Sequence, residues 1–282
     1  MALIRCNFMS EALELATSMT VVLPQRSTAQ IGLPQRPGDQ EAGEVRAGED
    51  RAGGGREGRA GGEQAAPPVL YLLHGLTDDD TAWTRYSSIE RYAAAQGLAV
   101  VMPQVHRSFY ADEKYGLKHW TFLSEELPAI VESMFRVSTR REDTFVAGLS
   151  MGGYGALKWA LRRPERFAAA ASLSGALDLA YMVEYDKRPH VAEVIGRVFG
   201  GVSPAGTDDD LLHLLTRAGD RLPRLMVRCG TGDHLLPHSE RFVEAARKEG
   251  VGLEVDFGPG GHDWDYWDEH VQAVLDWLPL ER

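Results

Sequence analysis

The sequence contains only two cysteines, Cys6 and Cys229, in 282 residues. They lie far apart in apolar, strand-like stretches, so we interpret them as buried free thiols in a reducing compartment, not as a disulfide or catalytic groups. No apolar run approaches the roughly 20 residues that span a bilayer. The first 24 residues mix charged and polar residues with apolar ones and lack the hydrophobic stretch of a signal peptide. We therefore expect a cytoplasmic protein without a membrane span.

Positive charge is also scarce. The sequence has 30 Lys and Arg residues but 41 Asp and Glu residues, which gives a formal net charge of -11. A surface of this charge repels polyanions, so the composition argues against a nucleic-acid partner and against binding to an anionic membrane. The hydrophobic content of 44% is enough for a full core. The length fits one large α/β domain or two small ones.

One segment has no aromatic residue and almost no β-branched one. Residues 35–68 are rich in Gly, Ala, Glu and Arg, with charges of both signs. Such a segment cannot bury enough surface to offset the entropy of ordering, so we expect a disordered or loosely held insertion. It separates two stretches that have the pattern of folded structure. We interpret residues 1–282 as a single domain that carries this insertion, and the sequence has no internal repeat.

The rest of the chain alternates short apolar strands with helices of 10–15 residues. We expect helices over Trp83–Gln96, Phe122–Phe135 and His238–Glu249, after the elbow strand described below, and near the C-terminus. This alternation predicts an α/β protein with a mostly parallel sheet covered on both faces. Residues 181–223 interrupt the alternation with a long, mainly helical segment, which we expect to form a small cap over the strand ends. The predicted strands are Leu3–Phe8, Met19–Leu23, Val69–Leu73, Leu98–Met102, Phe167–Ser172, Leu225–Arg228 and Leu253–Phe257.

The most informative stretch is Thr144–Leu161. Apolar residues that favour a strand lead into Gly148-Leu149-Ser150-Met151-Gly152, and a helical pattern follows. This is the context of a nucleophile elbow, in which a sharp turn between strand and helix exposes one serine. The flanking glycines have a mechanical reason, because a turn this tight brings backbone against backbone and leaves no room for Cβ atoms. We predict that Ser150 is a catalytic nucleophile.

A serine hydroxyl needs a base, and the base needs an orienting acid. Where the nucleophile lies on such an elbow, the acid and then the histidine follow it in the chain, on loops after late strands. Asp233 lies on the loop that follows the predicted strand Leu225–Arg228, and we favour it as the acid. Asp178, which follows the preceding strand, is the alternative.

Nine histidines compete for the role of base. His262 lies in a turn-rich loop between the last predicted strand and the C-terminal helix, where the expected chain order places the base. His234 and His238 lie too close to Asp233 to come last in that order, and His270 lies inside a helix. We therefore predict the catalytic residues Ser150, Asp233 and His262.

The oxyanion of a tetrahedral intermediate needs backbone N–H donors. Met151 directly follows the nucleophile, and we expect its N–H to be one donor. The second should come from the loop after the strand Val69–Leu73, where we choose the N–H of Leu76. Four aromatics on or near these loops are either core residues or the wall of a substrate pocket: Trp83, Tyr110, Trp120 and Tyr181. Asp78-Asp79-Asp80 is interpreted as a loop that caps the following helix and not as a cation site.

Six segments of the chain carry a resemblance to a known family: Tyr71–Leu76, Phe109–Asp112, Glu125–Pro128, Ala147–Gly155, Ser172–Gly175 and Gly261–Trp264. Together they resemble the esterase D family of α/β-hydrolases and, within it, the small tributyrin-esterase-like carboxylesterases. The likeness covers nearly the whole chain except residues 35–68. The resemblance implies the α/β-hydrolase fold, hydrolysis of short-chain acyl esters, and no metal or organic cofactor. If several of the four aromatics line the acyl site, they would leave a small pocket suited to acetyl, propionyl or butyryl groups. The implied partner is a small-molecule ester, and a homo-oligomer is compatible with the sequence.

Several related activities stay open. S-formylglutathione hydrolases are similar but commonly carry Gly-Leu-Thr-Cys where this chain has Gly75-Leu76-Thr77-Asp78. Feruloyl and acetylxylan esterases share the fold, but they are often secreted. Mycolyltransferases are also similar, and an acyltransferase differs only in the acceptor that attacks the acyl-enzyme. Binding proteins without catalysis also occur on this scaffold, but they usually lack the serine or the histidine.

Overall fold

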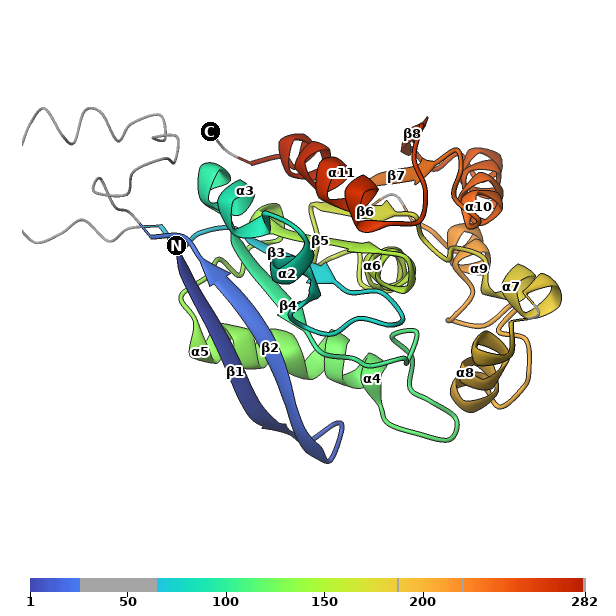
Figure 1. The fold of residues 1–282 in the computed structure, drawn as a ribbon, viewed down its shortest axis with the longest axis horizontal. Coiled ribbons are helices and arrows are strands. Elements are labelled where there is room, and N and C mark those ends of the chain that lie inside the picture. Colours follow the sequence, from blue (N-terminus) through green and yellow to red (C-terminus); the bar gives the residue numbers. More distant parts are fainter. Residues whose placement is uncertain (26–64, 187, 220, 281–282) are drawn as a thin grey trace, which may run out of the picture.

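An eight-stranded sheet forms the centre of the molecule, with the strand order β1-β2-β4-β3-β5-β6-β7-β8 (Figure 1). The computed structural model describes residues 1–25, 65–186, 188–219 and 221–280. We expected an insertion over residues 35–68. Its residues 35–64 lie outside the described residues. The strands are β1 (Ala2–Ser10), β2 (Leu15–Leu23), β3 (Val69–Leu73), β4 (Ala99–Pro103), β5 (Thr144–Leu149), β6 (Ala169–Leu173), β7 (Arg224–Gly230) and β8 (Glu254–Gly258).

The sheet is mostly parallel, as the alternation of strands and helices predicts. Strands β4, β3, β5, β6, β7 and β8 run parallel to one another, and β2 joins β4 in antiparallel pairing. Strands β1 and β2 form a hairpin paired from Ala2 with Leu23 to Ser10 with Leu15. The second strand of this hairpin therefore begins four residues before the predicted Met19, because pairing with β1 extends it beyond its apolar half.

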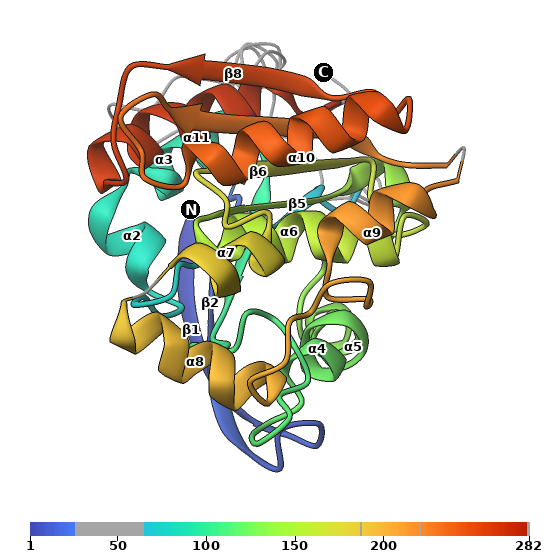
Figure 2. The same cartoon turned by 90° about the vertical axis from the view of Figure 1, so that its right-hand side faces the viewer.

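Helices cover both faces of the sheet (Figures 1 and 2). On one face α2, α3 and α11 pack on inward side chains that include Leu70 and Leu72. On the other face α5, α6 and α10 pack on side chains that include Tyr71 and Leu73. The helices are α2 (Ala82–Tyr86), α3 (Ile89–Gln96), α4 (His119–Thr121), α5 (Leu127–Met134), α6 (Met151–Arg162), α7 (Leu179–Tyr185), α8 (Pro189–Phe199), α9 (Leu211–Thr216), α10 (Leu236–Lys248) and α11 (Trp264–Trp277).

The helix predicted over Trp83–Gln96 is two helices, and this prediction was wrong at its centre. Ser87 has extended backbone angles, and its hydroxyl donates to the carbonyl of Trp83 and accepts from the N–H of Ile89. A serine side chain that bonds to nearby backbone groups in this way competes with the helical ladder. The chain therefore turns between α2 and α3.

Three helices, α7 to α9, lie within residues 181–223 or begin just before them. Helices α7 and α8 lie at the right-hand side in Figure 1 and face the viewer in Figure 2. Both cysteines are free thiols, as predicted, but the predicted burial is confirmed only for Cys229, because Cys6 is half-buried. Within the described residues, none of the helices has the length and apolar character needed to cross a membrane.

Candidate active site

Ser150 lies at a strained turn between β5 and α6. Its backbone has φ 54° and ψ −118°, a conformation that costs free energy for a residue with a Cβ atom. Two hydrogen bonds to β6 and the segment after it hold the turn: the N–H of Ser150 donates to the carbonyl of Leu173 at 2.9 Å, and its carbonyl accepts from Ala176 at 3.2 Å. The hydroxyl is thereby presented at the carboxyl end of the sheet.

The two glycines of the elbow leave no space for a side chain. A Cβ atom on Gly148 would lie 2.4 Å from the carbonyl oxygen of Gly152. A Cβ atom on Gly152 would lie 2.4 Å from the carbonyl oxygen of Leu73, at the end of β3. The glycines therefore let the elbow and the neighbouring strand end approach each other closely.

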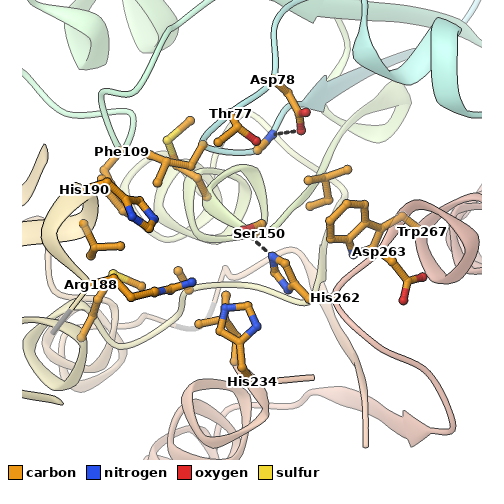
Figure 3. A pocket seen from close by; sticks show the side chains of 18 of the residues that line it. Thr77, Asp78, Phe109, Ser150, Arg188, His190, His234, His262, Asp263 and Trp267 are labelled. Atoms are coloured by element: carbon orange, nitrogen blue, oxygen red, sulfur yellow. Dashed lines mark hydrogen bonds between the residues drawn. The ribbon is translucent and has the colours of Figure 1, made fainter. Parts of the chain in front are cut away.

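Ser150, His262 and Asp233 lie in one hydrogen-bonded row. The Nε2 atom of His262 is 3.1 Å from the Oγ atom of Ser150 (Figure 3). Its Nδ1 atom is 3.0 and 2.9 Å from the two carboxylate oxygens of Asp233. These residues come from the loops after β5, β8 and β7, so parallel strands bring together side chains separated by up to 112 positions. The order and spacing match a nucleophile, a base and an orienting acid.

The environment of Asp233 keeps its carboxyl group ionised. Its side chain is fully buried, and burial alone would raise the pKa of Asp233. The imidazole of His262, the N–H of Leu235 at 2.7 Å and the hydroxyl of Ser174 outweigh burial and lower that pKa. An ionised carboxylate at Nδ1 is the arrangement that would stabilise an imidazolium at His262.

The other acid candidate has a different position. Asp178 caps α7 by accepting from the N–H of Tyr181 at 2.8 Å, and it pairs with Arg241 at 2.6 Å. It is not within hydrogen-bonding distance of His262 in the described structure. His238 packs behind it, with Nδ1 3.4 Å from the N–H of Asp178. The side chain that orients His262 is therefore that of Asp233.

The turn after β3 carries the second expected oxyanion donor. The N–H of Gly75 donates to the carboxylate of Asp78 at 3.1 Å, and the N–H of Asp78 donates to the carbonyl of Gly75 at 3.3 Å. Leu76 lies within this turn and lines the cavity beside Ser150. Met151 is the first residue of α6 and also lines that cavity. The N–H groups of the first helical turn have no partner within their own helix, which suits an anionic oxygen.

His74 supports this turn from inside the protein. It is buried, and burial lowers its pKa, so the imidazole is neutral. Its Nε2 atom accepts from the N–H of Val105 at 3.2 Å, which places the proton on Nδ1. The protonated Nδ1 donates to the carbonyl of Gly75 at 2.7 Å. The imidazole therefore ties the turn after β3 to the segment after β4.

A cavity of about 390 Å³ opens above Ser150 (Figure 3). The turn after β3, the elbow, the α7–α8 segment and the loops after β7 and β8 all contribute to it. Its apolar wall consists of Leu76, Phe109, Leu149, Met151, Ala176, Met182, Val191, Leu235, Trp264 and Trp267. Its polar lining includes Thr77, Asp78, Arg188, His190, His234 and Asp263.

None of the four aromatics proposed for the pocket lines this cavity. Trp83 is buried one layer behind it, and its indole N–H donates to the carbonyl of Leu73 at 3.2 Å. Tyr110 is buried against Gly155. The ring of Trp120 lies under the guanidinium of Arg162, 4.0 Å from its carbon. Tyr181 packs on the rings of Tyr185 and His238. Trp83, Tyr110 and Trp120 are thus buried in the core, and Tyr181 is half-buried on α7.

Sequence reasoning missed the aromatics that do line the cavity. Trp264 and Trp267 belong to the first turn of α11, which begins two residues after His262. The ring of Trp267 packs at nearly right angles to those of His262 and Trp264. Their closeness to the histidine in sequence could have identified them. Phe109 lies next to Tyr110, so the error there was one position. Arg188 and His190 lie at the start of α8, where no motif marks them.

The three successive aspartates form three separate contacts. Asp78 holds the turn of Gly75, and Asp79 accepts from the N–H of Thr81 at 2.9 Å and pairs with Arg85. Asp80 is buried and accepts from hydroxyls of β2. In the described part of the chain, the one group of side chains with donor atoms close enough to hold a metal is Asp233, His234 and His262.

Comparisons with known proteins agree with this geometry. A protein-family model described as "Putative esterase" matches residues 62–278. An acetyl esterase from Caldicellulosiruptor saccharolyticus is 31% identical over 219 residues, which cover 74% of this chain and 82% of that protein.

Solved structures from Staphylococcus aureus are similar over nearly the full length. The fluorophosphonate-binding serine hydrolase FphF has a TM-score of 0.80 and 29% identity, with 99% of each chain covered. The S-formylglutathione hydrolase FrmB has a TM-score of 0.78 and 30% identity, with 99% of this chain and 98% of that chain covered. Because the family model spans most of the chain and the fold is that of α/β serine hydrolases, this protein belongs to the esterase family and is a serine ester hydrolase.

Proposed function

We propose that this protein hydrolyses short-chain acyl esters, from acetyl to butyryl, through an acyl-enzyme on Ser150. The observation that carries the proposal is the row of contacts from Ser150 Oγ through His262 to Asp233, at 3.1 and 2.9 Å. The acetyl esterase relative supports a small acyl group. The resemblance to esterase D and tributyrin-esterase-like enzymes supports the same class.

In the first half of the reaction, Ser150 attacks the ester carbonyl carbon and His262 Nε2 takes the proton of its hydroxyl. The N–H groups of Met151 and Leu76 bind the oxyanion that forms. The intermediate collapses as His262 returns the proton to the leaving alcohol, and the acyl group stays on Ser150. In the second half, water gives a proton to His262 and attacks the acyl-enzyme, which releases the acid and restores Ser150.

The cavity supports the choice of a small acyl group. Its volume of about 390 Å³ has to hold both sides of the ester. Phe109, Trp264 and Trp267 give the apolar wall its bulk. A site of this size near the lower end of ligand pockets suits small esters better than long acyl chains.

The test is a chain-length series of p-nitrophenyl esters from acetate to decanoate. We expect the highest kcat/KM between acetate and butyrate. Ser150→Ala should lower kcat by at least about 10⁴-fold while circular dichroism and thermal unfolding stay unchanged. Asp233→Asn should also lower kcat severely, whereas Asp178→Asn should not. Turnover retained by folded Ser150→Ala protein would overturn the proposal.

A second candidate is a thioesterase that acts on S-formylglutathione. The similarity to FrmB over nearly the full length favours it. Asp78, where such enzymes commonly carry cysteine, argues against it. Measuring S-formylglutathione beside butyrate esters decides between the two, and product analysis with added alcohols shows whether acyl transfer competes with hydrolysis.

A further inference from the structure

Arg188 brings a permanent positive charge to the cavity. Among the described residues that line it, Arg188 is the one lysine or arginine. Figure 3 shows its side chain extending from the start of α8 toward the space around Ser150. The side chain is 46% exposed, so its charge is accessible to a ligand.

Asp186 holds this guanidinium in place. The Nε atom of Arg188 lies 3.0 Å from both carboxylate oxygens of Asp186, and Nη2 lies 2.6 Å from Oδ2. The N–H of Arg188 also donates to Asp186 at 3.0 Å. Within the part of the chain that the structure describes, these contacts use Nε and Nη2 and leave the N–H groups of Nη1 for a ligand. Asp186 is only 14% exposed and does not line the cavity, so it orients the arginine from behind.

The two carboxylates that do line the cavity are bound to backbone groups. Asp78 accepts from the N–H of Gly75 at 3.1 Å. Asp263 caps α11 by accepting from the N–H of Tyr266 at 3.0 Å. Neither hydrogen-bonds to Arg188. Burial and the neighbouring His262 lower the pKa of His234, and Arg188 adds to this shift, whereas Asp233 and Asp186 oppose it.

We propose that the physiological ester carries a carboxylate and that Arg188 binds it. This inference rests on the proposed function and specifies its substrate class. A guanidinium held in a fixed orientation matches the planar geometry of a carboxylate, and such charge-assisted hydrogen bonds are stronger than neutral ones. The polar wall at Arg188 would hold the carboxylate, while the apolar wall would hold the rest of the substrate.

The test compares two pairs of esters, in each of which one member carries a carboxylate and the other a neutral group at the same position. 4-Acetoxybenzoate and its methyl ester place the carboxylate on the leaving group, and monoethyl succinate and ethyl butyrate place it on the acyl group. The measured quantity is kcat/KM for the charged ester divided by that for its neutral partner. We expect Arg188→Gln to lower this ratio about tenfold for at least one pair, and Arg188→Lys to lower it less. The pair that responds identifies the side of the ester that carries the charge.

Arg197→Gln is the matched control. Arg197 lies on α8, the helix that begins directly after Arg188; it is 44% exposed and pairs with Glu113, but it does not line the cavity. The ratio should stay unchanged in this variant, and in wild type it should fall as ionic strength rises. Ratios that are equal in wild type and Arg188→Gln for both pairs would overturn the inference.

A binding measurement distinguishes failure of this inference from failure of the proposed function. Ser150→Ala protein should bind 4-acetoxybenzoate more tightly than its methyl ester in calorimetry, and adding Arg188→Gln should remove the difference. This measurement does not depend on hydrolysis. If neutral esters turn over but no charge effect is found, only the inference fails. If no ester turns over but the binding difference is present, the proposed function fails and the carboxylate site stands.

Discussion

Lys158 is fully buried on α6, the helix that follows Ser150, and its Nζ atom donates to the carbonyl of Tyr110 at 2.7 Å. The same ammonium group pairs with Asp209. Tyr110 and its neighbour Phe109 both have positive φ angles, 51° and 48°, which are unfavourable for residues other than glycine. A buried cation thus stabilises a strained pair of aromatic residues, one of which lines the cavity.

Further hydrogen bonds link Tyr110 to the turn that contains Leu76, the expected oxyanion donor. The hydroxyl of Tyr110 donates to the carbonyl of His74 at 2.8 Å. His74 in turn holds Gly75, the residue before Leu76. Helix α6 therefore holds both residues of the expected oxyanion site: Met151 through its own first turn, and Leu76 through Lys158 and Tyr110.

Replacing Lys158 by methionine should impair the chemical step more than substrate binding. Without the ammonium group the Phe109–Tyr110 pair loses its anchor and the turn at Leu76 moves. We expect kcat to fall about tenfold or more, since one oxyanion donor is worth roughly 10²–10³ in rate and here it is displaced, not removed. The affinity for a trifluoromethyl ketone, which mimics the tetrahedral intermediate, should fall in parallel, while KM changes little.

Leu157→Ala is the control for a general loss of stability. Leu157 is the preceding residue on α6, is equally buried, and takes no part in the Lys158–Tyr110 contacts. It should cost about 2–5 kcal/mol of stability with little effect on kcat of the folded protein. If both variants lower kcat to the same extent, Lys158 is only a structural residue.

Local sequence chemistry was enough to locate the centre of the site. Only glycine fits at Gly148 and Gly152, and strand ends fix where a loop residue such as Asp233 or His262 emerges. These features depend on residues close in sequence or on the direction of parallel strands. They could therefore be predicted, together with the parallel sheet.

The wall of the cavity could not be predicted in the same way. Which of Phe109 and Tyr110 lines the cavity depends on left-handed backbone angles, which no glycine or turn motif in the sequence indicates. The direction of Arg188 depends on Asp186, a local pair whose orientation toward the cavity is set by the packing of α8. Side-chain direction in such segments follows tertiary contacts, and residue spacing does not encode it.

Gly152→Ala should damage both stability and activity. Its Cβ atom would lie 2.4 Å from the carbonyl oxygen of Leu73 and 2.7 Å from that of His74, so the elbow and the strand end must separate. We expect a loss of at least about 2 kcal/mol in the free energy of unfolding, from overpacking against rigid backbone. Denaturant unfolding measures this loss. Gly196→Ala on α8 is the matched control: nothing lies within 4 Å of its Cβ, and alanine should stabilise the helix by about 0.5–1 kcal/mol.

The stability of the fold should fall as the pH drops from 6.5 toward 4. Burial lowers the pKa of His238 to about 4, although Asp178 opposes this shift. Between these pH values the unfolded chain binds a proton that the folded state does not, so protons favour unfolding. His238 alone should cost about 1 kcal/mol of stability between pH 7.5 and 5.5. Denaturant unfolding at the two pH values measures it, and His238→Asn should reduce the difference. A difference unaltered by that substitution would contradict the assignment.

Zinc ions should inhibit the enzyme reversibly through His234. The rings of His234 and His262 lie 4.6 Å apart, and their donor atoms and those of Asp233 are within 4.8 Å of one another. Two imidazoles and a carboxylate form a typical zinc donor set, and ligation would take His262 out of its proposed role as a base.

The test is a titration of esterase activity with ZnCl₂. Activity should fall as zinc is added and return when EDTA removes it. His234→Asn should raise the inhibitory zinc concentration at least about tenfold, because it removes a ligand, and even the loss of an outer-shell partner of a ligand typically costs 10–100-fold in metal affinity. His190→Asn, at another histidine of the same cavity, should leave zinc sensitivity unchanged relative to its own metal-free activity. Equal sensitivity in all three proteins would place the inhibitory zinc elsewhere.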